Sequence, residues 1–267
     1  MAHFLRDQQV TNLSATEDNL AQLSSTFMER AAMLNSNVSD DARLDKGAFV
    51  TYIIRFDNKG YRVFSLDDLL RYFAEAKTVE RVLFTLETGE SLRSNRQIGT
   101  FMELRLDERE PNSSFLTVTS DDKDWVDASF SAVQDTLAKS RNRNGWVRTA
   151  WTVFAVQLIG VTLGFLLSLW AAAKIAPRLA IENALIFSFL FVLLIFSNTW
   201  TFINQLILRL MNMAFPNIKF FRRGKERLNW LLQAVVGGIV AAVVLYVFDQ
   251  SASFVLQILS GVLRKDA

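Results

Sequence analysis

The chain has 267 residues, a formal net charge of +2 and 51% hydrophobic residues. The charge is unevenly divided, because residues 1–147 hold 23 Asp and Glu against 18 Lys and Arg, whereas residues 148–267 hold 4 against 11. The high share of hydrophobic residues excludes a disordered chain, and the uneven division of charge excludes a protein that is soluble throughout. The absence of Cys excludes disulfides, thiolate metal sites and a Cys nucleophile.

An amphipathic helix is predicted near the N-terminus. Leu20, Leu23, Phe27 and Ala31 recur at helical spacing and therefore share one face. The pattern is too short for a coiled coil, so the helix either docks on its own domain or serves oligomerisation. Residues 1–45 are accordingly expected to be a helix followed by a polar linker.

Residues 46–140 are predicted to form a cytoplasmic α+β domain. Apolar residues alternate at positions 49–56, and the polar turn after them predicts a hairpin. The further elements expected are a helix at 66–76, strands at 79–86, 100–107 and 115–119, and a helix at 122–139. The expected fold class is a mainly antiparallel sheet of about five strands with helices packed on it.

This domain shows no catalytic constellation. Asp121, Asp122, Asp124 and Asp127 precede or begin the last helix, where carboxylates cap free N–H groups more often than they bind a cation. No phosphate-binding, dinucleotide-binding or nucleophile-elbow motif occurs. We therefore expect no enzyme activity, no metal and no cofactor. The acidic balance of this half argues against nucleic acid as a partner.

Three apolar runs follow a basic juxtamembrane linker at residues 141–148. They lie at about residues 150–173, 184–208 and 228–248. Each is long enough for the ~20-residue helix that crosses a bilayer. A shorter apolar segment at residues 251–263 can lie in the interface, re-enter the membrane or extend the third helix. Residues 149–267 are therefore predicted to be a membrane domain of three transmembrane helices.

Basic residues flank these runs unevenly. The flanks assigned to the cytoplasm hold 10 Lys and Arg, whereas the loop between the first two runs holds 2. By the positive-inside rule, the protein is a multi-pass protein of the inner or plasma membrane whose N-terminal domain faces the cytoplasm. Contact with anionic lipid is a second explanation for the basic clusters. The candidates for that contact are Arg141, Arg143, Arg148, Arg222, Arg223, Lys225 and Arg227.

Small residues recur at every fourth position of the first and third runs. They are Gly160, Gly164, Ser168 and Ala172 in the first run and Ala234, Gly238 and Ala242 in the third. This spacing lets helix backbones approach closely in lipid, either within one chain or between copies.

Polar side chains gather near the centre of the second run. Asn198, Thr201 and Gln205 share one helical face, and Asn204 lies beside them. Amides in hydrocarbon are costly without partners. This intramembrane polar face is therefore a helix–helix contact, an oligomer seam or the lining of a water-filled path. No span core holds an ionisable residue, which argues against proton-coupled transport and voltage sensing.

The expected function is that of a non-enzymatic sensing or interaction module coupled to a three-helix, self-associating membrane domain. The α+β domain would bind an unknown cytoplasmic protein or ligand and pass that state through the helix ending near Ser140. The alternative is an oligomeric pore-forming or membrane-perturbing effector of the bacterial toxin or defence type. Membrane lipids and further copies of the chain are the other expected partners.

Overall fold

The computed structural model describes residues 3–36, 38–39, 43–221, 234–235 and 237–238. The chain divides into two compact units. The first comprises Met1–Gly145 and Pro216–Glu226, and the second comprises Trp146–Phe215 and Arg227–Ala267. The first unit thus contains the N-terminal helix and a segment that follows the second apolar run, in addition to the expected residues 46–140.

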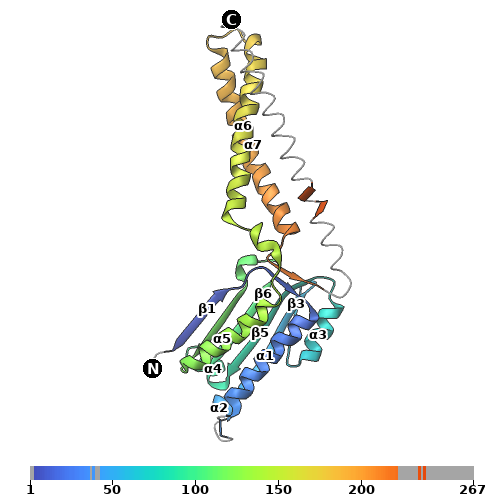
Figure 1. Cartoon of the computed structure of the whole chain (residues 1–267), viewed down its shortest axis with the longest axis vertical. Coiled ribbons are helices and arrows are strands. Elements are labelled where there is room, and N and C mark those ends of the chain that lie inside the picture. The colour runs from blue at the N-terminus through green and yellow to red at the C-terminus, as the bar shows by residue number, and fades with distance from the viewer. Residues whose placement is uncertain (1–2, 37, 40–42, 222–233, 236, 239–267) are drawn as a thin grey trace. The chain divides into compact units, whose positions relative to one another are not determined.

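A six-stranded antiparallel sheet forms the centre of the first unit, with the strand order β1-β7-β6-β5-β3-β4 (Figure 1). Its strands are β1 (Phe4–Gln9), β3 (Ala48–Phe56), β4 (Lys59–Val63), β5 (Val79–Thr88), β6 (Phe101–Asp107) and β7 (Phe115–Ser120). Five of them coincide with strands that the alternating pattern predicts. The additional strand, β1, lies at the edge and is exposed at all six residues, so its sequence carries no alternation.

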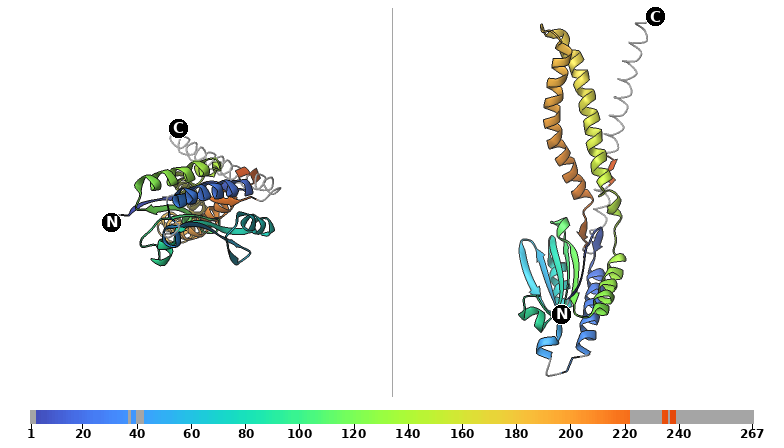
Figure 2. Two further views of the ribbon diagram at one scale, coloured as in Figure 1. Left: turned by 90° about the horizontal axis from the view of Figure 1, so that it is seen from below. Right: turned by 90° about the vertical axis from the view of Figure 1, so that its left-hand side faces the viewer.

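Helices cover one face of this sheet, as the two views of Figure 2 show. The long helices α1 (Glu17–Ser36) and α5 (Lys123–Ala138) pack against each other, and α3 (Leu66–Glu75) packs beside α1. The N-terminal helix therefore docks on its own domain. Ser65 caps α3 by accepting a hydrogen bond from the Asp68 N–H, and Asp122 caps α5 in the same way. The short elements are α2 (Arg43–Lys46), α4 (Gly89–Arg93), η2 (Pro111–Ser113) and η3 (Arg143–Trp146).

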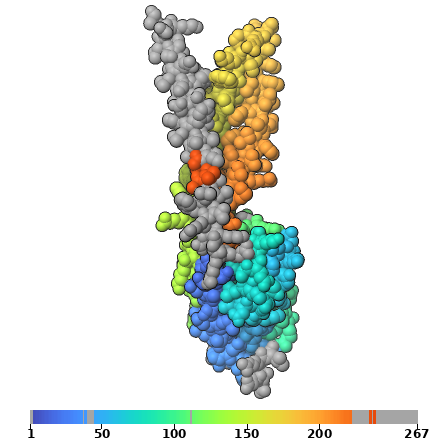
Figure 3. Space-filling view, turned by 90° about the vertical axis from the view of Figure 1, so that its right-hand side faces the viewer, coloured from blue at the N-terminus to red at the C-terminus, as the bar shows by residue number. Residues whose placement is uncertain are grey.

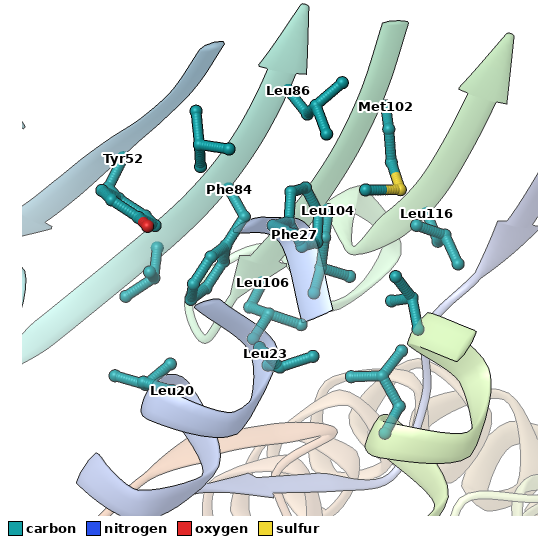
Figure 4. Close-up of a cluster of buried hydrophobic side chains, with 14 of the residues drawn as sticks. Leu20, Leu23, Phe27, Tyr52, Phe84, Leu86, Met102, Leu104, Leu106 and Leu116 are labelled. Carbon is teal, nitrogen blue, oxygen red and sulfur yellow. The ribbon is translucent and has the colours of Figure 1, made fainter. Parts of the chain in front are cut away.

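The hydrophobic core lies between α1, α5 and the sheet (Figure 4). The Phe84 ring lies 5.5 Å from the rings of both Phe27 and Tyr52. The Tyr52 hydroxyl lies 2.7 Å from the Ser24 Oγ, which satisfies its polar tip, and burial raises the pKa of Tyr52. Burying one such aromatic side chain stabilises the fold by about 1.5–3 kcal/mol.

The opposite face of the sheet carries ion pairs. Asp107 is 1% exposed and accepts hydrogen bonds from Arg81 Nε at 2.6 Å and from Arg105 Nη2 at 2.9 Å. Burial alone would raise the pKa of Asp107. The Glu110 N–H and the two guanidinium groups outweigh burial and hold that pKa below its ordinary value. The carboxylate is therefore charged and paired inside the protein.

The described part of the second unit consists mainly of a helical hairpin, the yellow and orange surface in Figure 3. Its helices, α6 (Ala150–Ile175) and α7 (Ala184–Ala214), pack against each other and are connected through η4 (Ala176–Arg178). Both are long and apolar enough to cross a membrane.

The third expected span lies almost entirely outside the described residues, as does the segment 251–263. Ala234, Val235, Gly237 and Gly238 are helical and exposed. The structure therefore contains two long apolar helices in its described part, against the three spans that the sequence predicts.

Candidate coupling site

A second, two-stranded sheet joins distant parts of the chain within the first unit. β2 (Leu13–Ala15) pairs in parallel with β8 (Ile218–Phe220), which follows α7 in the sequence. The N–H of Phe221 continues the ladder by donating to the last carbonyl of β2 at 2.8 Å. The chain thus leaves the first unit after Gly145 and returns to it at Pro216.

The other edge of β2 holds the segment that follows α5. The N–H of Ser14 donates to the carbonyl of Ser140 at 2.9 Å, and the N–H of Asn142 donates to the carbonyl of Asn12 at 2.7 Å. β2 and the residue before it are therefore hydrogen-bonded both to the segment that leads to α6 and to the segment that returns from α7. We call this arrangement, residues 10–15, 140–145 and 216–221, the coupling site.

Asn217 is the buried polar centre of the coupling site and is only 4% exposed. Its Oδ1 accepts a hydrogen bond from the Asn12 N–H at 2.8 Å, and its Nδ2 donates to the Val10 carbonyl at 3.3 Å. Its own carbonyl accepts from the Leu13 N–H at 2.9 Å. Asn12 has a φ of 60°, a left-handed conformation that Asn adopts more readily than most residues. The side chain of Asn217 therefore fixes the turn that leads into β2.

The outgoing and returning segments also contact each other. Asn144 Nδ2 donates to the Pro216 carbonyl at 3.0 Å. A Cβ atom on Gly145 would lie 2.6 Å from Asn12 Nδ2, so a larger residue there would have to push the Asn12 amide aside. The outgoing and returning segments are thus joined directly by the hydrogen bond from Asn144 to Pro216.

Side chains anchor β8 in the core. Ile218 is fully buried, and Phe220 is 8% exposed and meets Phe73 of α3 edge-on, with ring centroids 6.1 Å apart. Glu108 accepts hydrogen bonds from Lys219 Nζ at 2.7 Å and from the Phe220 N–H at 3.1 Å. The three-residue strand β8, which follows the hairpin in the sequence, therefore contributes Ile218 and Phe220 to the hydrophobic core of the first unit.

A surface pocket of about 230 Å³ adjoins the coupling site and shares Val10, Leu13 and Arg141 with it. Its other walls come from the end of β1, from β7 and from the last turns of α5. Gln8, Thr11, Gln134 and Asp135 line it with polar groups. This combination of amides, one carboxylate and one guanidinium suits a small polar ligand.

Three of the basic residues assigned to lipid contact lie in the described part of the chain. Arg141 and Arg143 are exposed. Arg148 is half-buried, and its Nη1 donates to Asn212 Oδ1 at 2.9 Å and to the Phe215 carbonyl at 3.2 Å. Burial lowers the pKa of Arg148. Arg148 thus ties the start of α6 to the end of α7, a role of which the sequence gives no sign. The other four, Arg222, Arg223, Lys225 and Arg227, lie outside the described residues.

The small residues of α6 lie against α7. They are Gly160, Gly164, Ser168 and Ala172, and all four are buried. A Cβ atom on Gly160 would lie 1.7 Å from Trp200 Cε2, and one on Gly164 would lie 2.4 Å from Phe196 Cδ1. Of the two arrangements that this spacing allows, the structure contains packing within one chain. In the third run, Ala234 and Gly238 are exposed, and Ala242 lies outside the described residues.

The polar residues of α7 divide between two sides of the helix. Asn198, Thr201 and Gln205 are exposed, and Nδ2 of Asn198 donates within the helix to the Leu194 carbonyl at 3.2 Å. Asn204 is half-buried, and its Oδ1 is buried without a partner among the described residues. The structure therefore separates Asn204 from the other three residues of the expected polar face.

The sheet carboxylates are held in ion pairs. Arg96 lies 3.0 Å from Glu103 and 3.6 Å from Glu87, and Glu80 lies between Arg55 and Arg109. Within the described ranges, no three or more His, Asp or Glu residues are grouped so that they could hold a metal ion. These carboxylates therefore act in the fold as partners of arginine.

No protein-family model, curated protein or solved structure matches this chain. Its function is therefore inferred from the geometry of the coupling site and the chemical character of α6 and α7.

Proposed function

We propose that the protein is a membrane-anchored binding module whose α+β domain passes its ligand-bound state to a membrane-embedded hairpin. The observation that carries the proposal is the double attachment of β2. This strand and Asn12 hydrogen-bond to the segment leading to α6 and to the segment returning from α7. A shift of β2 on ligand binding would act on both ends of the hairpin together.

The exterior of α6 and α7 supports the membrane location. Large apolar side chains on both helices are at least half exposed, among them Trp151, Phe154, Phe165, Phe187 and Phe202. Lipid solvates such a surface, whereas water would drive it to aggregate. Since the chain leaves and re-enters one unit, a spanning hairpin would have both ends on the same side of the membrane.

The pocket beside the coupling site supports the binding role. A small polar ligand, or a polar side chain of a partner protein, would contact Leu13 and Arg141 there. Leu13 is a β2 residue, and Arg141 forms an isolated β-bridge with it. A ligand in the pocket would therefore contact β2, the strand that is hydrogen-bonded to both ends of the hairpin.

Labelling of single cysteines should show the proposed orientation, because the chain has no Cys of its own. In intact cells, a membrane-impermeant maleimide should label Leu179→Cys and should leave Gln97→Cys unlabelled until the membrane is permeabilised. Leu179 lies just after η4, at the tip of the hairpin, and Gln97 lies in the α+β domain; both are exposed. The excess of basic residues at the other ends of the helices motivates this orientation. The reverse labelling pattern would place the α+β domain outside the cell.

The coupling itself can be measured by how freely the hairpin opens. Ser168 is fully buried between α6 and α7, so Ser168→Cys should react slowly with a membrane-permeant maleimide. Phe27→Leu loosens the core of the α+β domain and should increase that reaction rate, because the coupling site transmits the disturbance. Adding Asn217→Ala removes the two side-chain hydrogen bonds of Asn217, to the Asn12 N–H and the Val10 carbonyl, and should abolish the increase.

Asn112→Ala is the matched control for Asn217→Ala, because Asn112 is an exposed Asn of the same domain. It should leave the effect of Phe27→Leu intact. If Phe27→Leu changes the rate equally with and without Asn217→Ala, or not at all, the coupling site transmits nothing and the proposal fails.

One observation favours the second candidate function, a pore-forming or membrane-perturbing oligomer. Asn198, Thr201 and Gln205 are exposed on one face of a long, mainly apolar helix. If several copies gathered with these groups inward, the polar face would line a water-filled path. Release of ions from liposomes that contain the purified protein would support this function, and tight liposomes would exclude it.

A further inference from the structure

We propose that one face of α7, formed by Leu194, Asn198, Thr201 and Gln205, is a seam that pairs with the same face of a second copy of the chain. We call it the amide face. The inference rests on the membrane location proposed above and identifies the partner of that membrane part.

The amide face points away from α6. Phe196 and Trp200, each two residues from Asn198, are the α7 residues that contact the glycines of α6. Two residues correspond to about 200° of helical rotation, so Asn198 projects from the opposite side of α7. In agreement, Leu194 is 65% exposed and the other three members of the amide face are exposed as well. Among the described residues, packing on α6 therefore leaves this face exposed.

The members of the amide face have the spacing of a coiled-coil seam. Leu194 and Thr201 are one heptad apart, as are Asn198 and Gln205, and the two pairs are offset by four residues. These are the a and d positions of a helix that packs along a parallel partner. An Asn at such a position is known to fix register and oligomeric state. The spacing thus suits a helical partner that runs alongside α7.

The amides of this face need partners in lipid. Asn198 uses its NH₂ group within the helix, and its Oδ1 has no partner among the described residues. The side-chain amide of Gln205 makes no hydrogen bond to any of the described residues. An unpaired amide in hydrocarbon is costly, and a hydrogen bond across helices removes the cost. The face therefore favours an occupant with polar groups at the same depth.

A second copy is the occupant whose chemistry fits. Two copies in one membrane have the same orientation, so their α7 helices run parallel and place Asn198 opposite Asn198 and Gln205 opposite Gln205. An amide is both donor and acceptor, so identical amides satisfy each other. The remaining apolar run, residues 228–248, carries two amides, Asn229 and Gln233, only four residues apart near its start, and no polar side chain at residues 234–245. It therefore cannot place an amide beside both Asn198 and Gln205, which lie seven residues apart.

Single-cysteine cross-linking in native membranes tests the seam. On mild oxidation, Thr201→Cys should form a disulfide-linked dimer at twice the 30.3 kDa mass of the chain, and Thr199→Cys should not. The two residues are matched, because both are exposed threonines of α7 whose hydroxyls donate to the carbonyl four residues earlier at 3.0 Å. Since each variant has one Cys, only two copies can produce the linked species.

A second experiment tests whether the amides hold the seam. In the Thr201→Cys chain, Asn198→Leu combined with Gln205→Leu should raise the dissociation constant in detergent about tenfold, given the strength of such bonds between membrane helices. Asn198→Gln keeps an amide and should retain the dimer. Unchanged dimerisation of the double Leu variant would overturn the seam, as would linkage of Thr199→Cys or absence of linkage at Thr201→Cys.

Failure of the seam is distinguishable from failure of the membrane proposal. A chain that an alkaline carbonate wash releases from membranes overturns the membrane location. A chain that the wash leaves in place, but that forms no Thr201→Cys dimer, overturns the seam alone.

Discussion

A chain that ends at Gly145 is expected to lose most of the stability of the α+β domain. Truncation there removes Ile218 and Phe220, which are buried in the core, and leaves the hydrogen-bonding groups of β2 without β8. Removing buried side chains of this size costs about 2–5 kcal/mol each, which together rivals the 5–15 kcal/mol stability of a typical domain. Urea unfolding and the dispersion of amide NMR shifts would measure the loss.

A linked chain should restore the domain. Asn144 Nδ2 bonds to the Pro216 carbonyl at 3.0 Å, so a short Gly/Ser linker can replace residues 146–215 and keep residues 216–221 in place. In this linked chain, Phe220→Ala should cost about 3–5 kcal/mol. Its half-buried neighbour provides the matched control, since Phe221→Ala should cost clearly less. Equal stability of the truncated and linked chains would mean that β8 is dispensable.

A smaller fragment that covers only residues 46–140 should fail to fold. It lacks α1, whose Leu20 and Phe27 are fully buried against the sheet (Figure 4). It also lacks β1, which pairs with β7 along its whole length. The fragment would therefore expose a large part of the core to water.

Local patterns in the sequence predicted the elements that depend on neighbouring residues. The alternation at residues 49–56 identified β3, because the strand period is encoded within a few residues. The edge strand β1 was missed because its two faces are equally exposed. The spacing of apolar residues in a sequence reveals an element only when one face of that element is buried and the other is exposed.

The coupling site depends on contacts that no local pattern records. β8 has three residues and pairs with a strand some 200 positions earlier in the chain. Its flanking basic residues suggested a role at the lipid surface, yet Phe220 is buried in the core. The role of Asn217 likewise follows only once Asn12 is brought beside it. Such non-local pairs need the folded structure.

Spacing along α6 located the helix-packing stripe but left its partner open. The same pattern of small residues serves contacts within a chain and between chains. Only the positions of Trp200 and Phe196 show that α7 occupies the stripe. The exposed amides of α7 and the buried glycines of α6 thus mark two different surfaces, which the sequence alone did not distinguish.

Gly160→Leu should separate α6 from α7. Even a Cβ atom at this position would lie 1.7 Å from Trp200 Cε2, so the larger side chain forces the helices apart. Overpacking of a tight contact costs about 1–3 kcal/mol. The loss should appear as a lower midpoint of thermal unfolding in detergent and as faster maleimide labelling of Ser168→Cys. Helix propensity acts in the other direction, since Leu is a better helix former than Gly, so a measured loss comes from packing.

Ala155→Leu is the control for Gly160→Leu, because Ala155 is an exposed small residue of the same helix. Lipid solvates a Leu at that position, so stability should be unchanged. A rescue identifies the contact itself. Trp200→Ala empties the space above Gly160, so Gly160→Ala should be harmful in the native chain and nearly neutral in the Trp200→Ala chain. If Gly160→Ala costs the same in both chains, or nothing in either, Trp200 does not lie over Gly160, and the stripe of small residues faces lipid instead of α7.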